Sequence, residues 1–218
     1  MPTAVVLSHR SVAHELGPLG DWLEAGGFAV TRVHREDAPD IPDADLLVVL
    51  GSPGSIASGF CTPAGDAEVE QVRAWVEADR PYLGICYGSQ ALARAIGGSV
   101  ERMRSTDRGW MTLASDPDEH AVLAGPWMVW HEDALTAPEH AQVRARSGNA
   151  DQVFSYRRAW GIQFHPELDS AALERMAVAL GAGPEDYAPL VTAMRNDEEG
   201  HRQRSLRLFD AFWADVSG

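Results

Sequence analysis

The sequence predicts an α/β fold, with a doubly wound, mostly parallel sheet and helices on both faces. In the first half of the chain, short apolar runs alternate with longer segments whose apolar residues recur at helical spacing. The stretch LLVVL within residues 44–51 is apolar without interruption, which is typical of a parallel strand covered on both faces. Strands separated by helices of this length indicate βαβ units.

The individual elements of the first half follow from the same patterns. β-Branched runs and period-two alternation predict strands at 3–9, 28–34, 44–51 and 81–85. Helical spacing, with paired glycines at the end of the first segment, predicts helices at 12–27, 65–80 and 87–96.

The second half changes from strand-like to helical patterns. Turn-rich connections predict antiparallel additions to the sheet, or a small second sheet, from strands at 109–114, 127–131, 141–147, 152–157 and 160–165. Helices are expected at 170–181, 185–194 and 205–216, and the charged segment 195–204 is interpreted as a solvated helix end or connection. A length of 218 residues suits one core, so we expect a single domain over 1–218, with 169–218 as its helical C-terminal segment.

The charge of the chain excludes several classes of function. A formal net charge of -14 repels phosphate backbones and anionic membrane surfaces, so we expect neither nucleic acid nor a membrane as a partner. All 18 basic residues are arginine, because the sequence contains no lysine. This excludes Walker A phosphate loops, Schiff-base chemistry and serines activated by lysine.

The N-terminus and the cysteines predict a cytoplasmic protein. The first residues lack the pattern of a signal peptide, and no apolar stretch approaches the roughly 20 residues of a membrane helix. Cys61 and Cys86 could form one disulfide, but free thiols in a cytoplasmic chain are the favoured interpretation.

Cys86 lies in the segment GICYGSQ (84–90), between a predicted strand and a predicted helix. A nucleophile flanked in this way by Gly84 and Gly88 occupies a sharp turn, where small neighbours let the strand and the helix approach. The helix N-terminus favours a thiolate, and the backbone N–H of Tyr87 would point toward an anion formed beside the sulfur. The alternative is an inert buried thiol, which is common for free cysteine.

His165 is the candidate base for this cysteine. It follows the apolar segment WGIQF, so it lies at the carboxyl end of a predicted strand, where doubly wound sheets place their sites. With Pro166 favouring an extended backbone, the side chains of His165 and Glu167 point to the same side. Glu167 can then orient the imidazole, as the third member of a catalytic triad does. A structural histidine at a strand end is the alternative.

Two further segments have weaker signals. The loop GSPGS (51–55) directly follows a buried strand; it is either an ordinary turn or a source of backbone N–H donors for an oxyanion hole. The segment WHED (130–133), taken with FHPE (164–167), could form a His/carboxylate metal site. A triad explains His165 and Glu167 without a metal, so we expect no metal and no cofactor.

The segments GSPGS, GICYGSQ, WHED and WGIQFHPE occur in this order in the chain. Together they resemble the class I, or triad, glutamine amidotransferases, and more closely the free-standing members that are similar to the amidotransferase domain of GMP synthetase. The resemblance runs from the first strand to about residue 168, and the segment 205–216 is similar to the family's closing helix. It implies a flavodoxin-like sheet with the family's arrangement of helices.

The resemblance also implies roles for single residues. Cys86 corresponds to the nucleophile, His165 to the general base and acid, and Glu167 to the orienting carboxylate. The backbone N–H groups of Ser52 and Tyr87 correspond to the oxyanion hole. The substrate-binding positions implied are Gly51, Gln90, Trp130, His131 and Asp133.

Three positions depart from the family's usual pattern. Ser52 stands in a loop that usually has the sequence Gly-Gly-Pro, and a serine can still supply a backbone N–H. Ser89 stands where relatives often have His or Met, and Glu132 replaces the glycine of the usual His-Gly-Asp. A glutamate beside the pocket could alter how the α-amino and α-carboxylate groups of the substrate are bound.

The resemblance implies hydrolysis of the γ-amide of glutamine through a Cys86 thioester. No lysine-bearing phosphate loop exists and few residues follow position 168, so we expect the ammonia to go to a separate synthase or ligase subunit. An alternative is a stand-alone hydrolase of γ-glutamyl amides or peptides that uses the same triad. A catalytically silent binding subunit is a third hypothesis, against which the intact set of Cys86, His165 and Glu167 argues.

Overall fold

The computed structural model describes residues 1–113, 121–148 and 150–218 and confirms the predicted fold class. A seven-stranded sheet has the order β2-β1-β3-β4-β9-β8-β7. Its five parallel strands are β1 (Thr3–Ser8), β2 (Ala29–His34), β3 (Leu46–Val49), β4 (Tyr82–Ile85) and β9 (Ala159–Ile162). Their order, β2-β1-β3-β4-β9, is that of flavodoxin-like sheets, in which sites form beyond the carboxyl ends of the strands.

The predicted antiparallel additions and the predicted second sheet both occur. β8 (Ala150–Tyr156) pairs antiparallel with β9, and β7 (Gln142–Ser147) pairs antiparallel with β8 at the edge of the large sheet. β5 (Ser99–Met111) and β6 (Trp127–Thr136) form a separate two-stranded antiparallel sheet.

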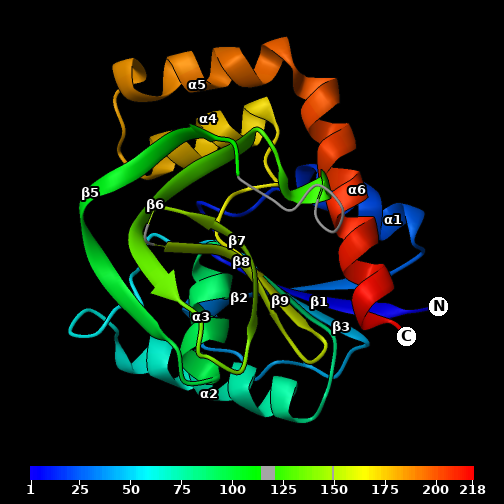
Figure 1. Cartoon of the computed structure of the whole chain (residues 1–218). Helices are drawn as coiled ribbons and strands as arrows, with labels where there is room; N and C mark the ends of the chain where they lie inside the picture. The colour runs from blue at the N-terminus through cyan, green and yellow to red at the C-terminus, as the bar shows by residue number, and fades with distance from the viewer. Residues whose placement is uncertain (114–120, 149) are drawn as a thin grey trace.

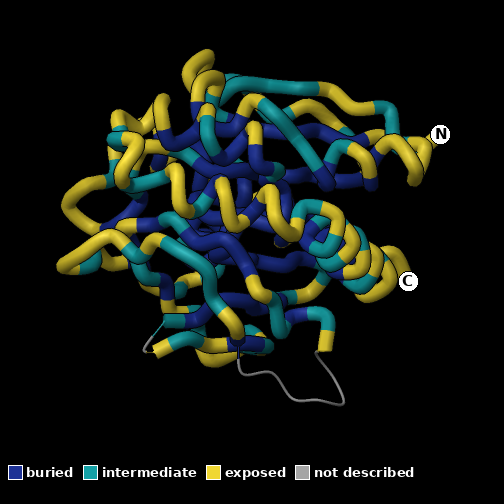
Figure 2. The backbone as a smooth tube through the Cα atoms, turned by 90° about the horizontal axis from the view of Figure 1, so that it is seen from above, coloured by how far each residue is buried: buried dark blue, intermediate teal, exposed yellow. Residues whose placement is uncertain are grey.

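Helices cover both faces of the large sheet (Figure 1). On one side lie α1 (Gly17–Ala25) and α6 (Glu198–Val216), and on the other α2 (Pro63–Glu77) and α3 (Tyr87–Ala95). Successive side chains of β3 point to opposite faces of the sheet and so divide the core into two apolar clusters. Leu46 and Val48 belong to the cluster on the side of α1 and α6. Leu47 and Val49 belong to the cluster on the side of α2 and α3. Figure 2 shows the resulting buried backbone through the centre of the molecule.

The remaining helices lie over the two-stranded sheet. α4 (Ser170–Ala179) and α5 (Pro184–Asn196) pack on β6 through a small apolar cluster that includes Met128, Leu173 and Met194. Short 3-10 turns occupy Arg35–Asp37 (η1) and Ala121–Leu123 (η2). Among the described residues, no helix combines the length and the apolar character needed to cross a membrane.

Several predicted boundaries were wrong. The first helix begins at Gly17, not at residue 12, because Pro18 suits only a first turn. The strand predicted at 109–114 is the end of β5, which begins at Ser99; Ala114 lies outside the described residues. Segment 195–204 is mainly the first part of α6, and its His201 is buried rather than solvated.

Candidate active site

Cys86 lies on the turn between β4 and α3 with φ 54° and ψ −109°, a strained combination for a residue with a side chain. The two flanking glycines make this turn possible. A Cβ atom at Gly84 would lie 2.4 Å from the carbonyl oxygen of Gly88, and one at Gly88 would lie 2.0 Å from that of Val49. The turn therefore brings the strand and the helix together more closely than any side chain would allow.

Hydrogen bonds hold the strained turn in place. The backbone N–H of Cys86 donates to the carbonyl oxygen of Ile162 at 2.8 Å, which ties the turn to β9. The Cys86 carbonyl accepts from the hydroxyl of Ser89 at 2.6 Å. Tyr87 is the first residue of α3, so its N–H has no acceptor within the helix.

His165 and Glu167 form a buried pair behind the cysteine. Nδ1 of His165 lies 2.8 Å from Oε1 of Glu167, and the two residues are 3% and 2% exposed. Burial lowers the pKa of His165, but the Glu167 carboxylate and the Cys86 thiol outweigh it and raise that pKa well above its usual value. Nε2 of His165 has no hydrogen-bond partner among the described residues, so it is free for a reacting group.

Gly51 marks the space that Cys86 and His165 share. A Cβ atom added at Gly51 would lie 3.6 Å from Cε1 of His165 and 4.0 Å from Cβ of Cys86. A single methyl group at Gly51 would thus contact both side chains. Cys86 and His165 therefore border the same space beside the loop 51–55.

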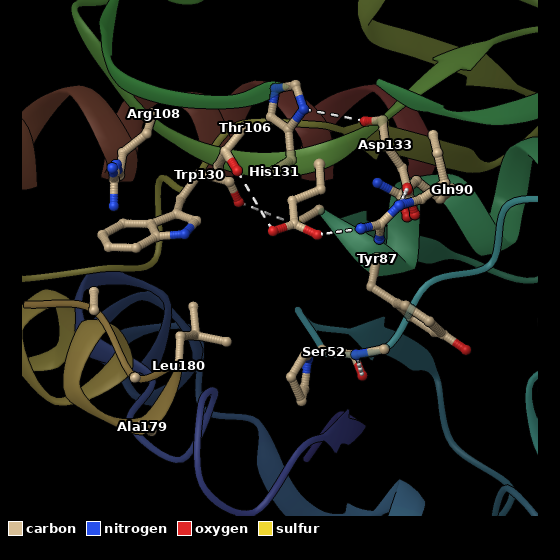
Figure 3. Close-up of a pocket in the computed structure, with 17 residues that line it drawn as sticks. Ser52, Tyr87, Gln90, Thr106, Arg108, Trp130, His131, Asp133, Ala179 and Leu180 are labelled. Carbon is tan, nitrogen blue, oxygen red and sulfur yellow. Dashed lines mark hydrogen bonds and ion pairs between the residues drawn. The ribbon is translucent and has the colours of Figure 1, made fainter. Parts of the chain in front are cut away.

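Cys86 lines a cavity of about 410 Å³. Figure 3 shows this cavity with the side chains around it. The residues expected at the site that line it are Ser52, Cys86, Tyr87, Gln90, Trp130, His131 and Asp133. Gly51, His165 and Glu167 do not line it and lie deeper in the fold. Seven of the seventeen residues that line the cavity were thus expected at the site from the sequence.

Strand β6 contributes three residues to the lining of the cavity, Trp130, His131 and Asp133. Nδ1 of His131 lies 3.1 Å from the backbone oxygen of Asp133, and burial lowers the pKa of this histidine. The Asp133 carboxylate accepts from the hydroxyl of Ser55 at 2.7 Å, and burial raises its pKa. Asp133 thereby connects the loop 51–55 to the wall of the cavity.

Two of the three departures from the family pattern, Ser89 and Glu132, have different places in the structure. Ser89 is fully buried and binds the Cys86 carbonyl, so it supports the turn and does not line the cavity. Glu132 does line the cavity and forms an ion pair of 2.5 Å with Arg102 of β5. The Gln90 side chain donates to Oε1 of Gln163 at 3.3 Å, which orients it at the cavity floor.

Sequence reasoning missed one side of the cavity. Arg102, Thr106 and Arg108 reach it from β5, and residues 179–182 reach it from the end of α4 (Figure 3). The guanidinium of Arg108 lies 4.9 Å from the centre of the Trp130 ring. The arginines could have been found from the antiparallel pairing of β5 with the WHED segment, whereas nothing in the sequence points to the end of α4.

Metal binding has no support from the arrangement of side chains. Within residues 1–113, 121–148 and 150–218, no three His, Cys, Asp or Glu side chains are placed to hold a metal ion. Both cysteines are free thiols.

The fold and the site define an α/β protein with a cysteine at a strand-to-helix elbow, facing a histidine and glutamate pair at the carboxyl edge of the sheet. The chain belongs to the class I glutamine amidotransferase family: residues 20–180 match the family described as Glutamine amidotransferase class-I.

Two curated relatives are similar to this chain over about two thirds of its length. The chain is 35% identical over 145 residues to a glutamine-hydrolysing GMP synthase of Thermomicrobium roseum, covering 63% of this chain and 27% of that enzyme. It is 31% identical over 152 residues to one subunit of the glutamine-hydrolysing GMP synthase of Ignicoccus hospitalis, covering 66% of this chain and 77% of that relative. The matched region thus spans only about a quarter of the full-length synthase.

Solved structures share the fold over nearly the whole chain. A glutamine amidotransferase from Thermotoga maritima superposes with a TM-score of 0.81 at 23% identity, covering 94% of this chain and 96% of that one. Another from Methylobacillus flagellatus gives 0.82 at 18% identity, covering 99% and 95%. At these identities the likeness supports the fold.

Proposed function

We propose that this protein hydrolyses the γ-amide of glutamine through a thioester on Cys86 and supplies the ammonia to a separate synthase. One observation carries the proposal: the strained elbow holds Cys86 next to a histidine whose other ring nitrogen is bound by a buried glutamate. Membership of a family of glutamine amidotransferases supports the substrate.

The proposed reaction has two halves. In the first, the Cys86 thiolate attacks the γ-carbonyl carbon, and the backbone N–H groups of Ser52 and Tyr87 stabilise the oxyanion. His165 then gives its proton to the leaving nitrogen, so ammonia departs and a γ-glutamyl thioester remains. In the second, His165 takes a proton from water, the hydroxide attacks the thioester, and glutamate and the thiolate are released.

Glu167 has an orienting role in this proposal. Its hydrogen bond to Nδ1 turns Nε2 of His165 toward the reacting atoms, and its charge stabilises the imidazolium. Gly51, Gln90, Trp130, His131 and Asp133 are proposed to hold the substrate; all but Gly51 line the cavity. Gly51 contributes by leaving room between the thiol and the imidazole.

A separate synthase chain is part of the proposal. The relative from Ignicoccus hospitalis is named as one subunit of a GMP synthase, and the sequence of this chain contains no lysine with which to build a Walker A loop. Ammonia formed here would then be used by a second chain.

A second candidate function is hydrolysis of γ-glutamyl amides or peptides without a partner. The cavity favours it, because its lining includes Arg108 and residues 179–182 as well as the residues expected to hold glutamine, at a volume of about 410 Å³. A leaving group larger than ammonia would contact Arg108 or residues 179–182. The thiol, the imidazole and the γ-glutamyl carbonyl would act in the same way.

Substrate competition separates these functions. The protein is incubated with glutamine and with a panel of γ-glutamyl peptides, and released glutamate and ammonia are measured, with Cys86→Ala as the control. Preference for glutamine supports the amidotransferase, and preference for peptides supports the stand-alone hydrolase. A silent binding protein would turn over neither and would leave Cys86 unlabelled by a glutamine-mimicking electrophile, which would sink both enzymatic functions.

A further inference from the structure

Arg35 is separated from the loop of residues 51–55 by strand β3. Its side chain contacts both parts of the proposed oxyanion hole, the loop at Gly51 and the residue Tyr87. We infer that it is a positioning residue that fixes the Ser52 N–H and the Tyr87 backbone for the oxyanion. The inference rests on the proposed function, and it names a residue for which the sequence motifs gave no signal.

The first half of the hole is held by two hydrogen bonds. Arg35 is the first residue of η1, directly after β2. Its Nη1 donates to the carbonyl oxygen of Gly51 at 2.8 Å, and its Nη2 donates to that of Leu50 at 3.0 Å. One guanidinium therefore holds two successive carbonyl groups on the same side of the loop.

Because the Gly51–Ser52 peptide is planar, the hydrogen bond to the Gly51 carbonyl also sets the direction of the Ser52 N–H group. In a planar trans peptide the C=O and N–H bonds point in opposite directions. The Gly51 carbonyl and the Ser52 N–H belong to one peptide unit, so a carbonyl held on Arg35 turns that N–H away from Arg35. Ser52 lines the cavity, and Cys86 also lines it. A loop containing glycine would otherwise rotate this peptide at little cost.

The second half of the hole is held by stacking. The central carbon of the Arg35 guanidinium lies 4.3 Å from the centre of the Tyr87 ring, a cation–π distance. The Tyr87 backbone carries the other proposed donor at the start of α3. Through this ring, Arg35 fixes the first residue of the helix relative to the loop.

Glu68 of α2 holds the guanidinium in turn. Its two carboxylate oxygens lie 3.3 Å from Nε and 3.2 Å from Nη2 of Arg35. Both side chains are 9% exposed, so the pair is nearly dry. The planar fork of arginine can bind a carboxylate, two carbonyls and an aromatic face together, whereas a lysine ammonium has three donors and no plane to stack.

The test separates orientation of the oxyanion hole from loss of charge and loss of fold. The variants are Arg35→Met, Arg35→Lys and Glu68→Gln. Arg80→Met is the matched control, because Arg80 makes the same kinds of contact at the amino edge of the sheet. Its guanidinium donates to the Asp43 carboxylate at 2.5 Å and to the Ala44 carbonyl at 2.6 Å. It also lies 3.4 Å from the centre of a Trp75 ring.

The first readout compares chemistry that uses the oxyanion hole with chemistry that does not. In Arg35→Met we expect kcat on the preferred substrate to fall about 10- to 100-fold with little change in KM, because the hole acts in the transition state. Alkylation of Cys86 by iodoacetamide, which forms no oxyanion, should change by less than about twofold. Glu68→Gln should show the same pattern more weakly, and Arg80→Met should match the wild type.

The charge-preserving variant decides between position and charge. We expect kcat in Arg35→Lys to fall nearly as far as in Arg35→Met, because lysine cannot bind both carbonyls and the Tyr87 ring. Full activity in Arg35→Lys would overturn the inference, as would equal losses of turnover and iodoacetamide reactivity in Arg35→Met.

A structural readout keeps the inference testable if no substrate is turned over. The backbone at Gly51 and Ser52 is compared between the wild type and Arg35→Lys or Arg35→Met, by crystallography or by the Ser52 amide signal in NMR. A rotated or mobile Gly51–Ser52 peptide supports the inference. An unchanged peptide in both variants would contradict it, whatever the fate of the proposed activity.

Discussion

The imidazole of His165 and the carboxylate of Glu167 are joined by a hydrogen bond of 2.8 Å, and both lie almost entirely out of solvent. Two residues apart in a segment with proline between them, they need no long-range fold to meet. The fold adds burial, which by itself lowers the pKa of His165, but the Glu167 carboxylate and the nearby Cys86 raise that pKa well above its usual value.

The roles assigned to this pair predict unequal effects. Glu167→Gln keeps the size of the side chain and loses its charge, so we expect a loss in kcat roughly 10- to 100-fold smaller than that caused by His165→Gln. Steady-state rates of both variants give the comparison, with thermal melting to verify folding. An equal or larger loss at position 167 would contradict the roles given to the two residues.

Cys86 should be needed for turnover and not for folding. Cys86→Ser is expected to abolish detectable glutamate release and to keep the melting temperature near that of the wild type. Cys61→Ser is the control, because burial raises the pKa of Cys61 to about 11 and that residue does not line the cavity. Activity retained in Cys86→Ser would overturn the nucleophile assignment.

The elbow glycine should be sensitive to a single methyl group. In Gly88→Ala the new carbon would overlap the Val49 carbonyl oxygen at 2.0 Å, so we expect a loss of about 3 kcal/mol in the free energy of unfolding. Gly54→Ala is the control for stability, since its new carbon would meet the nearest atom, Oγ of Ser52, at 3.4 Å. Denaturant unfolding of the two variants measures the difference; equal stability would show that the close approach is not required.

His201 should make the protein less stable in mild acid. Burial lowers its pKa from 6.5 to about 4, so between these values the unfolded chain binds a proton that the folded chain does not. This group's contribution then falls by about 1.4 kcal/mol per pH unit as the pH drops through that window, and is unchanged above it. His201→Phe should flatten the dependence of unfolding free energy on pH, whereas substitution of the exposed His14 by Phe should not. An unchanged slope in His201→Phe would refute the prediction.

Local sequence signals predicted the parts of the site that depend on short segments. The turn at Cys86 follows from two glycines at fixed offsets, and the pairing of His165 with Glu167 follows from an extended backbone. Two signals together predicted the parallel sheet. Strands alternate with helices along the first half of the chain, and residues 46–50 form the uninterrupted apolar run that a parallel strand covered on both faces needs.

Features that depend on contacts distant in sequence could not be predicted. Arg35 reaches Gly51 and Glu68 only because β2 and β3 flank β1 in the sheet. His201 is buried by Trp110 and Trp127 from the other sheet, although its neighbours in sequence are charged. β5 was missed over its first half because its residues there are mostly exposed and polar, and pairing with β6 compensates for their weak pattern.

The most direct test of the account is to trap the intermediate on Cys86. The protein is mixed with glutamine or the preferred γ-glutamyl peptide, quenched in acid during turnover and digested for mass spectrometry. We predict that the peptide containing Cys86 gains the mass of one γ-glutamyl group, and that the gain disappears in Cys86→Ala. Glutamate release at full rate with no acylated Cys86, or turnover that survives in Cys86→Ala, would contradict the account.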